Sequence, residues 1–186
     1  GYGNVGWGIM KKAAELGAKV TYFAGPDGYI HDPDGVDTEE KLNYILEMRA
    51  KDPMHCAPYA ERFGCEFVPN AKCWGVKDVD IYMPAATQND VNLDWAKNQK
   101  HMVVAPSKAV NAGGVSVSEL EMAQNAERLY WTAEEVDTKL KGIMKNIYHS
   151  SVEVAERYGL GYDLVAGANI VGFQKVADAM MAQGIF

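Results

Sequence analysis

The sequence predicts an α/β protein with a doubly wound, mostly parallel sheet, flanking helices and a helical C-terminal third. Strand-like runs alternate with segments of helical periodicity over the first two thirds of the chain. Short apolar runs such as "MVVAP" (102–106) suit parallel strands, which are buried on both faces. The chain also opens with Gly1, Gly3 and Gly6, a G-x-G-x-x-G spacing that normally joins a β-strand to a helix.

The segment after these glycines predicts a helix followed by a strand. Val5, Ile9, Ala13 and Leu16 recur at helical spacing, and Gly17 is a plausible helix stop. The run "AKVTYFAG" (18–25) is rich in β-branched and aromatic residues, which favour strands. The order turn, helix, strand is the second half of a β-α-β unit, of which only the first strand is lacking.

The remaining elements follow in the same way. Two turn clusters surround a short extended piece in "GPDGYIHDPDG" (25–35). A helix is predicted over 37–50, capped by Asp37 or Thr38 and burying Leu42 and Ile45. Further on, the patterns predict a helical end at 59–64, strands at 65–69, 79–86 and 102–106, and helices at 92–100, 115–129, 132–158 and 168–183.

Composition excludes several classes of function. The 186 residues suit one domain, and 48% apolar with 23% charged residues is typical of a globular protein. A net charge of −7 argues against nucleic acid and anionic membranes as partners. The three cysteines and four histidines make no metal-binding pattern, so we expect no metal and reduced cysteines in a cytoplasmic protein.

The glycine spacing is weak alone, but its context favours a dinucleotide site. A helix and a strand follow it, and then Asp27. In such Rossmann-like folds the glycines bring backbone amides to the pyrophosphate, and the carboxylate binds the ribose hydroxyls. Because Asp27 would repel a 2′-phosphate, it favours NAD over NADP. An ordinary turn aspartate in "GPDG" is an equally good interpretation.

Two later clusters also suggest ligand contacts. In "MPAATQNDV" (83–91), Thr87, Gln88 and Asn89 line a ligand or form a simple turn. In "APSKAVNAGGVSVSELEMAQN" (105–125), Gly113 and Gly114 suggest a close approach at a strand end, and the serines that follow are binding residues or helix caps. No Ser-His-Asp set, metal cluster or carboxylate pair stands out, so we assign no catalytic residue.

Together these clusters resemble the coenzyme-binding domain of hexameric glutamate dehydrogenases, especially the clostridial-type bacterial NAD enzymes. The resemblance covers essentially the whole chain in order. Its most specific parts are "SKAVNAGGV" (107–115) and "GANIVGFQKVADAM" (167–180). Leucine and phenylalanine dehydrogenases are similar, but they typically lack the "GPDGYIHDPDG" stretch and the serine at Ser118.

The resemblance implies a role for each matching residue. It implies coenzyme contacts at the pyrophosphate, the adenosine ribose and the nicotinamide, namely by Gly1, Tyr2, Gly3, Asn4, Val5, Pro26, Asp27, Ala86, Thr87, Gln88, Asn89 and Asn111. It further implies that Val115 and Ser118 reach the substrate, with Ser118 at the side-chain carboxylate of glutamate.

Two departures from the family pattern matter. The family's N-terminal domain, which carries the acid–base residues, is absent, as is the strand before Gly1. Between "DWAKNQK" and "HMVVAPSK" a further strand and loop are also absent. The sheet is therefore expected to be incomplete at its first strand and near residue 100. Either the protein was shortened, or the sequence joins stretches of a longer chain, and we favour the second.

We therefore expect residues 1–186 to form the NAD-binding domain of a glutamate dehydrogenase. Helix 168–186 would pack back toward the absent catalytic domain. The complete protein would be a cytoplasmic homohexamer that interconverts L-glutamate and 2-oxoglutarate. The alternatives are a stand-alone, non-catalytic nucleotide-binding module and a related leucine or phenylalanine dehydrogenase.

Overall fold

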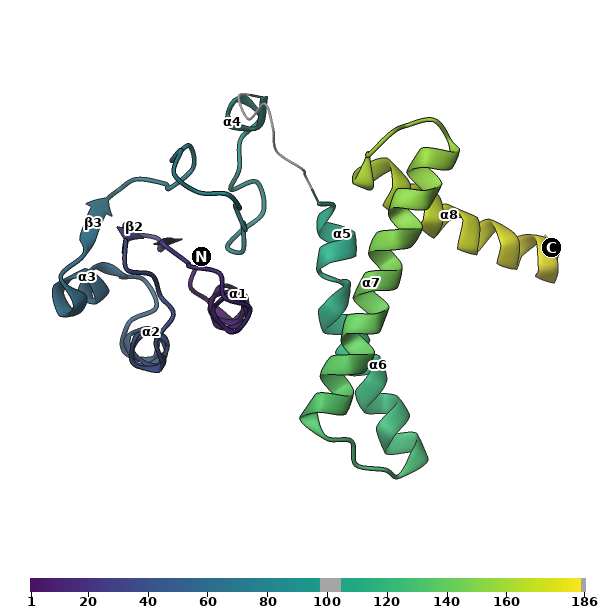
Figure 1. The fold of residues 1–186 in the computed structure, drawn as a ribbon, viewed down its shortest axis with the longest axis horizontal. Coiled ribbons are helices and arrows are strands. Elements are labelled where there is room, and N and C mark those ends of the chain that lie inside the picture. The colour runs from purple at the N-terminus through teal and green to yellow at the C-terminus, as the bar shows by residue number, and fades with distance from the viewer. Residues whose placement is uncertain (98–104, 185–186) are drawn as a thin grey trace. The chain divides into compact units, whose positions relative to one another are not determined.

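The computed structural model describes residues 1–97 and 105–184, which divide into two compact units within Gly1–Lys100 and His101–Phe186. We describe each unit by itself (Figure 1). The domain predicted over 1–186 is thus represented here by two units. Within the described ranges, no helix has both the length and the apolar character needed to cross a membrane.

The first unit combines helices with three short strands. Its elements are α1 (Asn4–Glu15), β1 (Tyr22–Ala24), β2 (Gly28–His31), α2 (Glu39–Lys51), α3 (Ala57–Phe63), β3 (Glu66–Pro69) and α4 (Leu93–Lys97). Of the two caps proposed for α2, Thr38 is the one used, since its hydroxyl accepts a hydrogen bond from the Lys41 amide at 3.3 Å. α1 ends before Gly17, which has a φ of +82°.

The sheet of this unit is antiparallel, which corrects the parallel sheet predicted from the sequence. The strands lie in the order β1-β2-β3, and the described residues contain no parallel pair. β1 and β2 form a tight hairpin, because the Gly25 amide donates to the Gly28 carbonyl at 2.8 Å. Local closure of this hairpin determines the direction of β2, so the strand cannot follow a crossover helix.

Two other predicted strands have different outcomes. Residues 79–86 form no strand and contain bends at positions 80 and 86, so the strand predicted there is wrong for this structure. A strand forms only where its backbone groups are hydrogen-bonded to a neighbouring strand. In the described residues, β1 pairs with β2 and not with residues 79–86. Most of the strand predicted at 102–106 lies outside the described residues. Only its last two positions, 105 and 106, are described.

The core of the first unit lies between the sheet and its helices. Ile30 and Ile45 are completely buried there, and the Phe23 and Tyr59 rings pack edge to face at 5.0 Å. A buried carboxylate accompanies them. Asp32 accepts hydrogen bonds from the Lys41 ammonium at 2.7 Å and the Tyr59 hydroxyl at 2.8 Å, which compensate for its removal from water.

The second unit is entirely helical where it is described. It contains α5 (Ser107–Val110), α6 (Ala112–Glu127), α7 (Ala133–Arg157) and α8 (Leu164–Gln183). Figure 1 shows α6 and α8 both lying against the long helix α7. Gly167 allows α8 to approach α7, because a Cβ there would collide with the Ser151 carbonyl. The three long helices confirm the predicted helical third, although α6 and α8 begin three and four residues earlier than expected.

Candidate functional site

Each glycine of the opening turn has a different environment. A Cβ at Gly6 would collide with the Gly1 carbonyl, so only glycine lets α1 approach the turn this closely. A Cβ at Gly3 would meet nothing within 4 Å. Gly3 therefore faces open space beside the N-terminus of α1, and as the N-cap residue it has no side chain to occupy the first helical amides.

The structure brings this turn against another predicted cluster. A Cβ at Gly1 would lie 2.8 Å from the Ala85 carbonyl oxygen and 3.0 Å from the Ala86 Cβ. The exposed residues Ala86–Asn89 follow directly. Gly1 and Ala86 are 85 positions apart in the sequence, so their contact joins the turn and this loop into one surface with free backbone donors at the N-terminus of α1.

The exposed loop is held by the residue that follows it. The Asp90 carboxylate accepts hydrogen bonds from the Lys72 ammonium at 2.9 Å and from the Trp74 indole at 3.1 Å. Asn89 adopts a left-handed conformation with a φ of +58°, which turns the chain between Gln88 and Asp90. The loop is therefore anchored at its end while its own side chains stay open to solvent.

An arginine that the sequence did not suggest fixes the opening turn. Arg49, near the end of α2, donates from Nη2 to Asn4 Oδ1 at 2.7 Å and from Nη1 to the Tyr2 carbonyl at 3.3 Å. Its guanidinium lies beside the N-terminus of α1. The positive charge of the guanidinium and the partial positive charge of the helix N-terminus both favour an anion there. Since Arg49 lies 45 residues from Asn4, no local sequence signal indicates this contact.

Tyr2 is a core residue of this structure. Its side chain is only 4% exposed, and its hydroxyl donates to the Pro53 carbonyl at 2.8 Å. Burial is the main reason that the pKa of Tyr2 rises to about 12, with the neighbouring Cys56 and Asp27 adding to it. Its ring therefore supports the turn from beneath, while Val5 and Pro26, also predicted to contact the coenzyme, are exposed.

Asp27 has partners of its own. Its carboxylate accepts hydrogen bonds from the Cys56 amide, at 3.0 Å to each oxygen, and from the Ala57 amide at 3.3 Å. It therefore caps α3 from a different loop. Partial burial opposes ionisation, but the hydrogen bonds from Cys56 and Ala57 outweigh it and lower the pKa of Asp27 below its ordinary value of 3.8.

The three predicted site residues of the second unit share one helix face. Asn111, between α5 and α6, is followed by Val115 and Ser118 at i+4 and i+7. All three are exposed, with Val115 at 69%. The Ser118 hydroxyl donates within the helix to the Gly114 carbonyl at 3.4 Å, so its oxygen is available as an acceptor.

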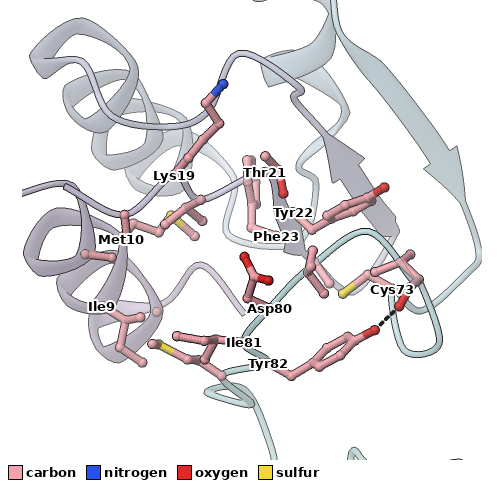
Figure 2. A pocket seen from close by; sticks show the side chains of 18 of the residues that line it. Ile9, Met10, Lys19, Thr21, Tyr22, Phe23, Cys73, Asp80, Ile81 and Tyr82 are labelled. Carbon is pink, nitrogen blue, oxygen red and sulfur yellow. Dashed lines mark hydrogen bonds between the residues drawn. The ribbon is translucent and has the colours of Figure 1, made fainter. Parts of the chain in front are cut away.

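A groove of about 500 Å³ adjoins the turn, since Gly1 and Gly6 are among its lining residues. Figure 2 shows Ile9 and Met10 of α1, Phe23 of β1 and residues Asp80, Ile81 and Tyr82 around it. The Tyr82 hydroxyl donates to the Val76 carbonyl and so closes the loop on the far side. The edge of β1 that does not pair with β2 faces this groove.

Metal chemistry has no candidate site in the described ranges, since no three of the potential ligands His, Cys, Asp and Glu gather there. The geometry that remains is a glycine turn at a helix N-terminus, flanked by a guanidinium, an anchored loop and a carboxylate. These features are the ones expected of the class of dinucleotide-binding proteins.

Comparison with known proteins narrows the class to one family. The model of the Glutamate/Leucine/Phenylalanine/Valine dehydrogenase family matches residues 1–101 and 96–184. The chain belongs to this family, and the resemblance inferred from its motifs is confirmed.

Three relatives indicate where in the family the chain falls. It is 58% identical to the NAD-specific glutamate dehydrogenase of Clostridium symbiosum, over all of this chain and 47% of that protein. It is 45% identical to the glutamate dehydrogenase of Bacteroides thetaiotaomicron, with the same two coverages. Identity to the NADP-specific glutamate dehydrogenase of Escherichia coli is 40%, over all of this chain and 46% of the relative.

Solved structures agree with this placement. One glutamate dehydrogenase structure matches with a TM-score of 0.94 and 57% identity, over 100% of this chain and 47% of the other. Plasmodium falciparum glutamate dehydrogenase 2 matches with a TM-score of 0.91 and 38% identity, over 99% and 46%. The chain thus spans about half the length of these relatives. The alignment to the clostridial enzyme covers 212 positions, 26 more than the 186 residues present here.

Proposed function

We propose that this chain is the coenzyme-binding part of an NAD-dependent glutamate dehydrogenase, which reversibly converts L-glutamate to 2-oxoglutarate and ammonium. The observation that carries the proposal is the 58% identity over the whole chain to an NAD-specific enzyme of that activity. The open face of Gly3 beside the N-terminus of α1 supports it, because a pyrophosphate needs such a close approach to backbone amides.

The residues divide the work of binding. The amides after Gly3 hold the pyrophosphate, and Asp27 accepts from the adenosine ribose and repels a 2′-phosphate. Ala86–Asn89 lie along the coenzyme, and Asn111 lies near the nicotinamide. Val115 and Ser118 contact the substrate, with the Ser118 hydroxyl at its side-chain carboxylate. NAD, when bound, supplies the hydride acceptor for the substrate α-carbon.

We further propose that the parallel, doubly wound sheet forms in the complete protein. The groove between β1 and residues 80–82 supports this, because it is lined by β1, by residues 80–82 and by the apolar residues Ile9 and Met10 of α1. A strand inserted there would pair with both edges and would lead directly into the glycine turn.

The partners of the complete enzyme belong to the same proposal. Phe173, Val176 and Met181 of α8 are exposed apolar residues, which supports packing of this helix on the substrate-binding domain. The homohexameric state and the cytoplasmic location are proposed on the family resemblance alone. Sedimentation of the purified enzyme would test the first, and cell fractionation the second.

The deciding experiment is a substrate and coenzyme panel with the complete protein. We expect NADH formation with L-glutamate, and much slower turnover with NADP or with leucine and phenylalanine. Turnover of leucine or phenylalanine in place of glutamate would assign a different member of the family. Intact mass spectrometry tests the stand-alone alternative, since a mass of 20.4 kDa supports that module and a mass about twice as large excludes it.

A further inference from the structure

Cys56 makes contacts with the Asp27 carboxylate that the proposed coenzyme site does not explain. Its amide donates to both oxygens at 3.0 Å, and its thiol lies 3.2 Å from Oδ1. The Ala57 amide adds a hydrogen bond to Oδ2 at 3.3 Å. Because both oxygens are engaged from the same side, the carboxylate cannot rotate without breaking hydrogen bonds to an ionised group, which are stronger than neutral ones.

The thiol acts as a donor in this arrangement. Cys56 is fully buried, and burial, followed by its hydrogen bond to Asp27, raises the pKa of the thiol to about 12. The thiol therefore keeps its proton at neutral pH. Its other acceptor within reach is the Gly28 carbonyl at 3.8 Å, which is farther away and uncharged. The proton is thus directed to Asp27.

The surrounding packing leaves this pair little freedom. A Cβ at Gly25 would lie 2.9 Å from Asp27 Oδ1, 3.1 Å from the Cys56 sulfur and 2.8 Å from the Tyr2 ring. The carboxylate and the sulfur therefore pack against the backbone of Gly25. The third neighbour, Tyr2, lies in the glycine turn between Gly1 and Gly3, so the carboxylate and the turn are held in one cluster.

We propose that Cys56 is a specificity-determining positioning residue, whose thiol and amide hold the Asp27 carboxylate in the orientation that selects NAD over NADP. The inference rests on the proposed function, since it presumes that Asp27 faces the adenosine ribose. It adds a residue that never touches the coenzyme. A carboxylate held in one orientation presents the same charge and acceptor to every coenzyme molecule, without an ordering cost on binding.

The test compares single variants in the complete protein. Dissociation constants for NAD and NADP are measured by direct titration for the wild type, Cys56→Ala, Cys56→Ser and Cys65→Ala. We expect Cys56→Ala to reduce the NAD-over-NADP preference about 3- to 10-fold, the effect of losing one hydrogen bond of ordinary strength, because a thiol is a weak donor even to a charged acceptor. Cys56→Ser keeps a donor and should stay within about twofold of the wild type. Cys65→Ala is the matched control, because Cys65 is a free cysteine that is only partly buried.

A double-mutant cycle separates positioning from general loosening of the fold. In an Asp27→Asn background, Cys56→Ala should leave the NAD-to-NADP ratio unchanged, because the thiol acts only through the carboxylate. An unchanged ratio in the single Cys56→Ala variant would overturn the inference, as would an equal loss in both backgrounds. If Cys56→Ala lowers the melting temperature strongly, Cys56→Ser still decides, since loss of preference there contradicts the donor role.

Failure of the underlying proposal would look different. A wild-type protein that binds neither coenzyme removes both the proposed function and this inference. If the wild-type protein prefers NAD and substitution of Cys56 leaves that preference unchanged, only this inference is contradicted.

Discussion

The guanidinium of Arg49 and the side-chain amide of Asn4 are joined by a hydrogen bond of 2.7 Å between Nη2 and Oδ1. This contact links the end of α2 to the start of α1. A second hydrogen bond, to the Tyr2 carbonyl, makes the same guanidinium a clamp on the glycine turn.

Replacing Arg49 with alanine should weaken NAD and NADP binding alike, by about tenfold, because the turn loses a clamp and its anion site loses a positive charge. The coenzyme affinities of Arg49→Lys should lie between those of the wild type and Arg49→Ala, because a lysine lacks the planar guanidinium that donates two hydrogen bonds in fixed directions. Titration calorimetry measures both coenzymes. Arg157→Ala, which removes an exposed pair on α7, is the control. A change confined to one coenzyme would argue against the clamp.

Alanine in place of Gly3 and alanine in place of Gly6 should have different effects on the fold. Gly3→Ala should keep the melting temperature, since its Cβ meets nothing within 4 Å, yet weaken NAD binding at least about tenfold by blocking the pyrophosphate. Gly6→Ala should destabilise the turn itself, because its Cβ collides with the Gly1 carbonyl. Thermal unfolding and NAD titration on the same samples separate the two. Unimpaired NAD binding by Gly3→Ala would place the pyrophosphate elsewhere.

Asp27 should make the stability of the protein sensitive to acid. Its pKa is lower in the folded protein than its ordinary value of 3.8, so the stabilisation is present above that value and is lost as the pH falls through the folded pKa. Asp27→Asn should therefore melt below the wild type at pH 7, and the difference should shrink as the pH falls below 3.8. Other carboxylates titrate in both proteins, so the difference in melting temperature isolates Asp27. A difference that stays constant with pH would contradict this assignment.

The buried Asp32 should be sensitive to the loss of either partner. Lys41→Met removes the cationic partner of this buried carboxylate, at a cost of about 3–5 kcal/mol. Tyr59→Phe removes one hydrogen bond, at a cost of about 1–3 kcal/mol. Thermal or urea unfolding measures both. Lys12→Met, which breaks a half-exposed pair with Glu15, should cost well under about 1 kcal/mol. Equal effects of Lys41→Met and Lys12→Met would show that burial of Asp32 has little effect.

Ser118→Ala should raise the KM for glutamate about tenfold and leave NAD binding unchanged, since the lost hydroxyl would contact only the substrate carboxylate. Initial-rate kinetics of the complete enzyme give both parameters. Glu119→Ala, at the next position on α6 and also exposed, controls for changes in the helix. Unchanged glutamate kinetics would leave Ser118 with its hydrogen bond inside the helix as its only role.

The helices could be predicted because their signals are local. The helical spacing of Val5, Ile9 and Ala13 predicts α1, although Val5 is exposed and Met10 is the buried side chain, and Thr132 with Glu135 forms a reciprocal cap at the start of α7. The sheet could not be predicted in the same way, since pairing depends on partners distant in sequence. The one local signal was the turn "GPDG" between two extended runs, which favours a hairpin over a crossover.

The glycines, Asp27 and the loop at Thr87 could be singled out from motifs, but the contacts that organise them could not. Arg49 and Cys56 reach the site from α2 and from the N-cap of α3, respectively 45 and 29 residues along the chain from Asn4 and Asp27. Neither belongs to a motif. The sequence also showed nothing of the burial of Tyr2, because an aromatic residue inside a glycine turn has the same pattern whether it faces ligand or core.

The free edge of β1 has a consequence for the order of folding. The β1–β2 hairpin closes over a few residues and forms quickly, whereas any strand that fills the neighbouring groove comes from outside the hairpin and arrives later. Until then an unpaired edge with apolar walls is open to any extended chain nearby, which is the condition for aggregation. In the arrangement proposed above, insertion of this strand completes the coenzyme turn. The same insertion covers the open edge of β1 and so protects the nascent protein from aggregation.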